Sequence, residues 1–592
     1  MHKIFRVQEL VDLVVQNLAV AMTTQTYPLA DDPSNVSYRM HLLSSDVKKD
    51  VKNLGQVGRI FREPCLNALW YHQEGIDDLL CMSSAIEAVS SSSGHMFSVS
   101  DQNQRNMPKL FRLARPLEPT DVPTLHFYAS RIHQLCFPPG LYQTQQKIGT
   151  DQPLLLGQSK FVRGTILFSR LRSLAWMQDW TTQSSDLDFV LDTTGNSLVE
   201  MASWTVAYRS QAKFLAKMEK QHRHLTHLRL RTDLYGGTRE QHRSATIEFF
   251  RTILPNARNL QELHLEDDFE QCFNVWDTLS SFPRLSSLSF RCLATSQELL
   301  DMIPTSPTPY RTLTSFIIHV DDSIFISQIL EKVCFPNLHK LQLTFYMDCE
   351  VHALRRLLLA VTHACADSPL QSLVIDYECY KDDDDQVPED PDAAEDVMKF
   401  DDLRPLLKYG TLEVLDLDVQ CPWIMGDDAV YEIVRVWGPR LKTLKLDTEG
   451  GWSTTESITL KGLEHLALHC PRLTTLGIHF IGTPPRDMCS VYKQVDRNGT
   501  RWNEALRELA VSSSPLDPSS VNDMAMYLSC LFPNLAHIAP AYWLTRPMLW
   551  DTDIDAAGPD GPYKSWEMVQ TMVPLIGLAR RQERLLAAAV EN

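Results

Sequence analysis

Several features that mark particular protein classes are missing from this sequence. No C-x-x-C motif occurs among its 13 cysteines, which are scattered singly, so neither a zinc ribbon nor a thioredoxin-type dithiol is indicated. No uncharged apolar run approaches the roughly 18 residues that indicate a membrane-spanning helix. An odd number of cysteines without a disulfide framework is typical of a reducing compartment. We therefore expect a cytosolic or nuclear protein with no membrane association.

Motifs of catalysis and nucleotide binding are missing as well. The sequence has no P-loop, GxGxxG, GxSxG or HExxH, so we predict no catalytic residues, no bound metal and no cofactor. One segment with an amphipathic helical pattern holds residues of metal-ligand types, but their spacing fits no standard zinc site: Cys349, His352, His363 and Cys365.

Positive charge is scarce. The chain has 56 Lys and Arg against 74 Asp and Glu, a net charge of −18, so we expect no nucleic-acid partner. The excess of acid is concentrated in DDDDQVPEDPDAAED at 382–396, which lacks the glycine of an EF-hand loop and contains two prolines. This composition predicts an acidic, disordered insertion over 380–400, either a solvated loop or a site for a basic partner.

The main pattern that is present is L-x-x-L-x-L, in which Ile, Val or Phe can replace Leu. It starts at residues 225, 260, 285, 313, 338, 370, 412, 441, 473, 506 and 535, with earlier copies at 132 and 171 and a degenerate copy near 198. A period of about 31 residues indicates a solenoid. The fourth and sixth positions face one side of a strand, and helical patterns lie between strands, as at 244–260 and 354–370. One strand and one helix cannot bury their apolar faces alone, so neighbouring repeats must stack.

These repeats resemble leucine-rich repeats of the longer variety, in which a full helix follows each strand. A proline before the strand recurs in FPRLSSL, FPNLHKL, CPRLTTL and FPNLAHI. The stretch GLEHLALHCPRLTTLGI at 462–478 is similar to the cysteine-containing subtype common in F-box proteins. We expect 463–470 to be helical, because its LEHLAL precedes a better strand by too few residues for a repeat. The resemblance implies an α/β solenoid over 110–545, with parallel strands on the concave side and helices outside. A coincidental Leu-rich helical protein is the alternative.

The first 80 residues carry two amphipathic segments. The first has helical spacing of Val7, Leu10, Leu13, Val14 and Leu18. A polar, aperiodic insertion at 19–45 separates it from the second segment at 46–61, after which Pro64 interrupts the pattern ahead of Leu69-Trp70. The order V-x-R-x-F…L-x-x-L-W resembles the diverged F-box of fungal proteins that carry leucine-rich repeats. We expect a small all-α module at 1–80 and a linker or N-terminal cap at 81–109.

In that family the F-box docks on a Skp-type adaptor, which links it to a cullin–RING ubiquitin ligase, and the repeats hold a substrate protein. The resemblance implies a non-catalytic substrate receptor of this kind, whose adaptor-binding residues are Leu10, Leu13, Leu18, Val57, Ile60, Phe61, Leu66, Leu69 and Trp70. Some of them must pack internally, and Trp70 fits a role inside the first repeat equally well. Two alternatives stay open: residues 1–80 only cap the solenoid, and the chain is a repeat scaffold without a ligase link.

The positions between the core residues of the strands would line one continuous face. Charged and histidine side chains at these positions form the candidate substrate face: His227, Arg229, Arg231, Glu262, His264, Glu266, Arg291, His319, Lys340, Asp416 and Asp418. The face changes from basic to acidic along the chain, and one hypothesis is that it recognises a target protein with complementary charge. The alternative is that any solvated sheet face is polar.

The repeat pattern stops near residue 545. A turn-rich linker follows, and we expect 563–590 to form a final helix with Trp566, Val569, Met572, Val573 and Ile576 on one stripe, kinked or divided by Pro574. This segment, 546–592, is expected to cap the last repeat. Docking to a partner is the alternative.

Overall fold

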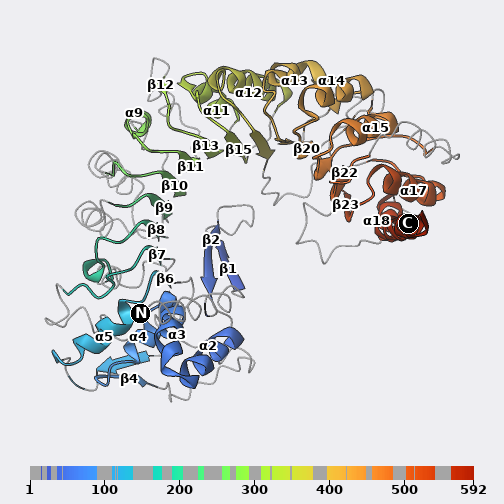
Figure 1. Ribbon diagram of the computed structural model, residues 1–592. Coiled ribbons are helices and arrows are strands. Elements are labelled where there is room, and N and C mark those ends of the chain that lie inside the picture. The colour runs from blue at the N-terminus through green and yellow to red at the C-terminus, as the bar shows by residue number, and fades with distance from the viewer. Residues whose placement is uncertain are drawn as a thin grey trace, which may run out of the picture. The chain divides into compact units, whose positions relative to one another are not determined.

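The structure, a computed structural model, divides into two compact units, Met1–Arg291 and Cys292–Asn592 (Figure 1). It describes residues 15, 23–28, 37–42, 45–89, 110–113, 115, 118–137, 165–176, 190–203, 224–231, 257–266, 275–292, 308–320, 323–346, 350–377, 397–419, 421, 423–448, 452, 457–484, 502–512, 514–540 and 562–591. Residues 244–256 of the predicted helix lie outside these residues, and residues 257–260 form a turn rather than a helix.

The first unit contains a parallel sheet with the strand order β3-β6-β7-β8-β9-β10-β11. The strands are β3 (His72–Glu74), β6 (Gln134–Phe137), β7 (Ser173–Trp176), β8 (Glu200–Ser203), β9 (His227–Arg231), β10 (Glu262–Glu266) and β11 (Ser287–Cys292). The helices described in this unit are α2 (Ser45–Val57), α3 (Arg59–Tyr71), α4 (Asp77–Leu80), α5 (Val122–Ala129) and α9 (Val275–Ser280).

The second unit contains a parallel sheet with the order β13-β15-β16-β18-β20-β21-β22-β23. The strands are β13 (Ser315–Val320), β15 (Lys340–Phe345), β16 (Ser372–Tyr377), β18 (Val414–Asp418), β20 (Thr443–Leu446), β21 (Thr475–Gly477), β22 (Glu508–Ser512) and β23 (His537–Pro540). The helical segments are α11 (Ser323–Leu330), α12 (Val351–Ala364), α13 (Phe400–Leu403), η6 (Arg404–Lys408), α14 (Asp427–Trp437), α15 (Leu460–His469), η7 (Pro518–Ser520), α17 (Val521–Leu531) and α18 (Pro562–Glu591).

Every predicted repeat forms a strand of one of these sheets, and each strand begins two residues after the first Leu of its pattern. The reason is visible at β16, whose side chains alternate between half-buried and buried. Leu370 precedes the strand, Leu373 and Ile375 lie within it, and all three are completely buried. The prediction of an α/β leucine-rich-repeat solenoid is therefore confirmed.

A backbone hydrogen-bond ladder sets the stacking distance between repeats. In successive repeats within each unit, the carbonyl of the residue after the first Leu accepts two N–H groups from the next repeat. The Gln371 carbonyl accepts from Glu413 at 2.7 Å and from Val414 at 2.9 Å, and the Glu413 carbonyl accepts from Lys442 at 2.7 Å and Thr443 at 3.1 Å. The same pairing recurs in the first unit, where the Thr226 carbonyl accepts from Gln261 and Glu262. Each repeat therefore fixes the register of the one that follows.

The helices of the second unit lie on one side of its sheet, on the outer side of the curve (Figure 1). The apolar side of α12 is buried, as an amphipathic repeat helix requires. The helix predicted at 463–470 is confirmed as α15, so its LEHLAL motif forms no strand.

Two segments outside the repeats contain strands that the sequence did not predict. The insertion at 19–45 contains an antiparallel pair, β1 (Thr23–Pro28) with β2 (Ser37–Leu42), and β2 contacts β3. The segment expected to be a linker or cap contains β4 (Ile86–Val89), which pairs antiparallel with β5 (Leu110–Leu113). Short parallel pairs also join β12 (Thr308–Pro309) to β14 (Val333–Cys334) and β17 (Met398–Lys399) to β19 (Trp423–Ile424).

The acidic insertion is shorter than predicted at its carboxyl end. Residues 380–396 lie outside the described residues, but Val397 and Met398 are buried and β17 includes Met398–Lys399. The fold includes Val397 and Met398 because both side chains are apolar and are buried.

The final helix α18 includes the predicted segment and continues through Pro574. It packs on α17 and β23. Trp566, Val569 and Val573 are buried, and the Trp566 indole donates to the Ser514 carbonyl at 2.8 Å. The predicted stripe thus faces the last repeat.

A buried carboxylate connects the loops that follow three consecutive strands of the second unit. Asp447 is completely buried, with φ of 45°, a left-handed conformation that Asp adopts more readily than most residues. Its Oδ2 accepts from the Cys421 N–H at 2.8 Å and from Trp423 Nε1 at 2.9 Å. Its carbonyl accepts from Trp452 Nε1 at 3.0 Å. The Trp452 ring stacks on His479, with centroids 5.7 Å apart.

We predict that Asp447→Ala lowers the stability of the second unit by about 2–4 kcal/mol, because two buried donors lose a charged acceptor. Asp447→Asn retains an acceptor oxygen and should lose less. Urea unfolding followed by tryptophan fluorescence measures both, since Trp423 and Trp452 lie at the site. Equal midpoints for the Ala variant and the wild type would contradict this role.

His479 predicts a pH dependence of stability. Burial lowers its pKa to about 4, whereas an unfolded histidine titrates near 6.5. Between these values the unfolded state binds more protons, so stability should fall as pH decreases from about 6.5 to 4, by up to about 3 kcal/mol. His479→Phe should remove this slope in urea unfolding at several pH values. The exposed His363→Gln serves as the control that keeps it.

Candidate functional site

The N-terminal candidate site is built on two helices that meet at Gly58. This residue is extended, with φ of −167° and ψ of 153°, and ends the run of α2 before α3 begins. The Phe61 N–H donates to the Gly58 carbonyl at 3.0 Å. The two helices pack against each other, which places the end of α2 and the start of α3 at one corner of the module.

The expected interruption at Pro64 is not observed, because α3 continues through this residue to Tyr71. Proline removes one backbone donor and is best tolerated near the start of a helix. Pro64 is nevertheless the sixth residue of α3, where it removes the N–H that would donate to the Ile60 carbonyl, and it is itself buried. The two short amphipathic runs of the sequence are therefore joined in a single helix.

A small apolar core holds the module together. Its buried members are Val15, Val51 and Cys65, and the half-buried side chains packed against them are Val47, Leu54, Phe61, Ala68 and Leu69. Val15 belongs to the first amphipathic segment of the sequence, so this segment contributes to the same core as α2 and α3. Burial raises the pKa of the Cys65 thiol, consistent with a packing role.

Two of the predicted adaptor-binding residues are exposed, and we call them the N-terminal patch: Val57, with 77% of its surface exposed, and Ile60, with 39%. Exposed cations predominate on the same two helices: Lys48, Lys49, Lys52, Arg59 and Arg62. Of the acids there, Glu63 is held by Arg131 of the following repeat at 2.6 Å. The helices thus present two bare aliphatic side chains among mainly positive charges.

The other predicted adaptor residues are placed differently. Phe61 and Leu69 pack on the module core, and Leu66 is half-buried. The remaining helix-one residues lie outside the described part of the chain: Leu10, Leu13 and Leu18. The sequence could not separate these groups, because one amphipathic helix carries both a packing stripe and its exposed flank.

Trp70 is buried at the junction with the solenoid. Its ring lies 4.8 Å from that of Tyr128 on α5. It stands two residues before β3, the position that the first Leu occupies in every other repeat. The His133 N–H donates to the Tyr71 carbonyl at 3.0 Å, as in the ladder between later repeats. Trp70-Tyr71 therefore begins an additional repeat, which the sequence reasoning missed because Gln73 and Gly75 occupy its later apolar positions.

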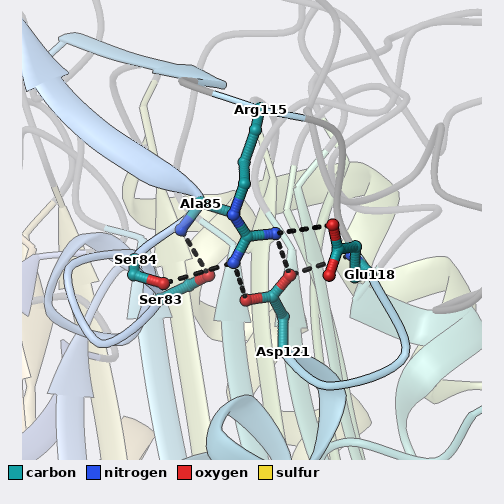
Figure 2. A network of polar contacts seen from close by, with 6 residues as sticks. All are labelled: Ser83, Ser84, Ala85, Arg115, Glu118 and Asp121. Carbon is teal, nitrogen blue, oxygen red and sulfur yellow. Dashed lines mark hydrogen bonds and ion pairs between the residues drawn. The ribbon is translucent and has the colours of Figure 1, made fainter.

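An arginine clamp fixes the segments that follow this repeat (Figure 2). Arg115 donates to both Asp121 carboxylate oxygens at 2.8 Å and to the Ser84 hydroxyl at 3.2 Å. Asp121 also accepts the Glu118 N–H at 2.8 Å. The bond from Arg115 lowers the pKa of Asp121 and outweighs its burial. The order Asp121-Val122-Pro123 is a recognisable helix start, but its arginine partner is not predictable from spacing.

In the first unit, the predicted substrate-face positions are in register. His227, Arg229 and Arg231 of β9 lie opposite Glu262, His264 and Glu266 of β10. The Glu262 carboxylate lies 3.6 Å from His227 Nε2 and 3.9 Å from Arg229. His264 is buried, whereas Arg291 on β11 is half-buried. Glu262 thus lies within ion-pair distance of two basic side chains of this face.

In the second unit, the face is more acidic. His319 lies in register with Thr344, which lies opposite Asp376, and Asp376 lies opposite Asp418. One pleat earlier, Asp416 pairs with Lys445 of β20 at 2.9 Å. Lys340 is half-buried at the start of β15, and burial lowers its pKa.

Within the described residues, no group of His, Cys, Asp and Glu is arranged to hold a metal ion. Of the four metal-type residues in the sequence, Cys349 is not described and Cys365 is completely buried. His352 instead lies 2.9 Å from Glu350. In the same part of the chain, no helix is both long and apolar enough to cross a membrane.

Comparison with known proteins gives a structural match only. No family model and no curated protein matches the chain. Among solved structures, a chain of the crystal structure of the Rad7 and Elc1 complex in yeast is similar, with 14% sequence identity, over 59% of this chain and 78% of that one. The TM-score of this match is 0.31, so it has no bearing on function.

Substitutions of buried and of exposed N-terminal residues should differ in their effect on the free energy of unfolding. We predict that Trp70→Ala destabilises the protein by about 3–5 kcal/mol, because a buried aromatic ring is lost. Val57→Ala should change stability by no more than about 0.5 kcal/mol, because this side chain is exposed. Urea unfolding of the full chain compares the two variants. A small effect of Trp70→Ala would show that the ring is not part of the first repeat.

Proposed function

We propose that the protein is a non-catalytic substrate receptor of a Skp–cullin–F-box ubiquitin ligase. The N-terminal helices would bind a Skp-type adaptor, and the repeat sheets would hold a target protein in the cytosol or nucleus. The observation that carries this proposal is the exposure of Val57 and Ile60 on a module that already buries its own core. Exposed aliphatic side chains at a helix junction have no packing role there.

The charges around the N-terminal patch indicate the kind of adaptor surface. The five exposed cations of α2 and α3 favour a partner with acidic side chains around an apolar contact. Such a surface resembles the anatomy of ordinary protein interfaces, in which an apolar centre lies within a polar rim. We propose a Skp-type adaptor as the partner because of the F-box resemblance, and the N-terminal patch as its contact surface.

The absence of a catalytic role is part of the proposal. Burial in the repeat cores raises the pKa of Cys365 and Cys470 to about 12. A thiol of such high pKa is a poor nucleophile at neutral pH. The chain would therefore position the target while other subunits perform the ubiquitin chemistry.

We predict that Val57→Asp/Ile60→Asp reduces adaptor capture by at least about tenfold, since two carboxylates would replace an apolar contact and oppose an acidic partner. The full chain is co-expressed with a Skp-type adaptor and isolated by affinity purification, and the bound adaptor is quantified. Leu359→Asp/Leu575→Asp, which places the same charges on exposed helix positions elsewhere, is the matched control.

Unfolding midpoints of both variants should equal that of the wild type, because all four side chains are exposed. If the wild-type chain captures no adaptor, the receptor role is wrong and the scaffold alternative is favoured. If adaptor is captured equally by the Val57/Ile60 variant, binding does not use this patch.

A further inference from the structure

Three consecutive strands of the second unit begin with a polar side chain on the same face of the sheet. Lys340 of β15 lies opposite Ser315 of β13 on one side and opposite Ser372 of β16 on the other. Neighbouring strands lie about 4.8 Å apart, so one ammonium is flanked by two hydroxyls. All three residues are half-buried, and the residue after each of them is buried. They therefore form one row that a ligand can reach from the face of the sheet.

The ammonium in the middle of this row has no counterion among the described residues. Burial lowers the pKa of Lys340, and its amine makes no ion pair or hydrogen bond within the described part of the chain. Asp416 lies two strands away and pairs with Lys445 at 2.9 Å. Lysine is rarely withdrawn from water without a partner, because its charged form loses hydration. The face thus holds a positive charge that no described carboxylate neutralises.

The neighbouring polar groups of the row are available in the same way. The hydroxyls of Ser315 and Ser372 make no hydrogen bond in the described strands and helices. Gln342, two residues further along β15, has a carboxamide without a described partner. It lies opposite Ile317 and Val374, which are half-buried aliphatic side chains. The strands therefore offer an ammonium and two hydroxyl donors, followed by an amide between two apolar side chains.

We propose that Ser315, Lys340 and Ser372, which we call the lysine row, bind the carboxylate of a glutamate or aspartate side chain of the target protein. A carboxylate has two oxygens with about four acceptor sites, enough for the ammonium and both hydroxyls. Charge-assisted hydrogen bonds of this kind are the stronger class. This inference rests on the receptor role proposed above and specifies its substrate class as a segment with an exposed acidic side chain.

The number of charges favours a carboxylate over a phosphorylated residue. Among the face positions of the described strands β13, β15 and β16, Lys340 is the only Lys or Arg. Phosphate carries a charge of about −1.5 to −2 at pH 7, so its second negative charge would meet no second cation on these strands. Ile317 and Val374 favour an aliphatic residue next to the acidic one, because it would bury apolar surface against them.

The test is isothermal titration calorimetry of the full chain with a peptide of four Gly-Glu-Leu repeats. Acetylation and amidation of its ends leave the glutamate side chains as its only carboxylates. Lys340→Met should bind the peptide at least about tenfold more weakly, because the charged donor is lost while the length of the side chain is kept. The control Lys332→Met makes the same change in net charge at an exposed residue after α11, and should bind within about twofold of the wild type.

Further peptides and variants define the chemistry. Replacing glutamate by glutamine in the peptide should abolish binding, and replacing it by phosphoserine should weaken it. Ser315→Ala/Ser372→Ala should weaken binding several-fold without lowering the unfolding midpoint, since these hydroxyls have no described partner to lose. The midpoint of Lys340→Met should equal or exceed that of the wild type, because a half-buried charge is removed.

The outcomes separate this inference from the receptor role. Peptide binding is measured without the adaptor, so a chain that captures no adaptor can still bind the peptide, and the reverse also holds. No binding by the wild type, unchanged binding by Lys340→Met, or an equal loss in Lys332→Met overturns the lysine row. Tighter binding of the phosphoserine peptide than of the glutamate peptide overturns the choice of a carboxylate.

Discussion

The structure depends on a single backbone carbonyl in each repeat that accepts two N–H groups from the next one. Within the first unit this bond pair recurs from the His133 carbonyl to the Gln261 carbonyl, and within the second unit from the Thr314 carbonyl to the Arg507 carbonyl. Because it fixes the register residue by residue, the apolar positions of successive strands lie in line and the positions between them lie in line as well. The sequence therefore determines which side chains line the face between the core positions. A one-residue slip in any repeat would turn its core side chains to the face and its face side chains to the core.

The same regularity explains what could be predicted. The L-x-x-L-x-L pattern places every one of its strands to the residue, since buried Leu side chains and the ladder require one spacing. The pattern fails at β3, where Trp70 replaces the first Leu and the later apolar positions are polar or Gly. It also says nothing of the β1–β2 and β4–β5 pairs, because short antiparallel strands outside the repeats need no periodic core.

The candidate site was predictable only in part. The helical spacing of α2 and α3 identifies their apolar residues, but burial depends on what each helix meets. Phe61 and Leu69 pack on the module core, Trp70 packs against Tyr128, and Val57 is exposed. The strand register aligns the predicted charged positions with one another within each unit. Which of them pair, as Glu262 does with Arg229 and Asp416 with Lys445, depends on side-chain reach between strands.

Two aspartates near one another show how the fold uses the same side chain in opposite ways. Asp447 is completely buried, and its carboxylate and carbonyl together accept three hydrogen bonds. These bonds connect the loops of neighbouring repeats. Asp418 is more exposed and faces Asp376 across the ladder. A solenoid spreads its stability over many equivalent interfaces. Its core positions are restricted to a few apolar residue types, whereas the positions between them hold charged, polar and apolar side chains alike.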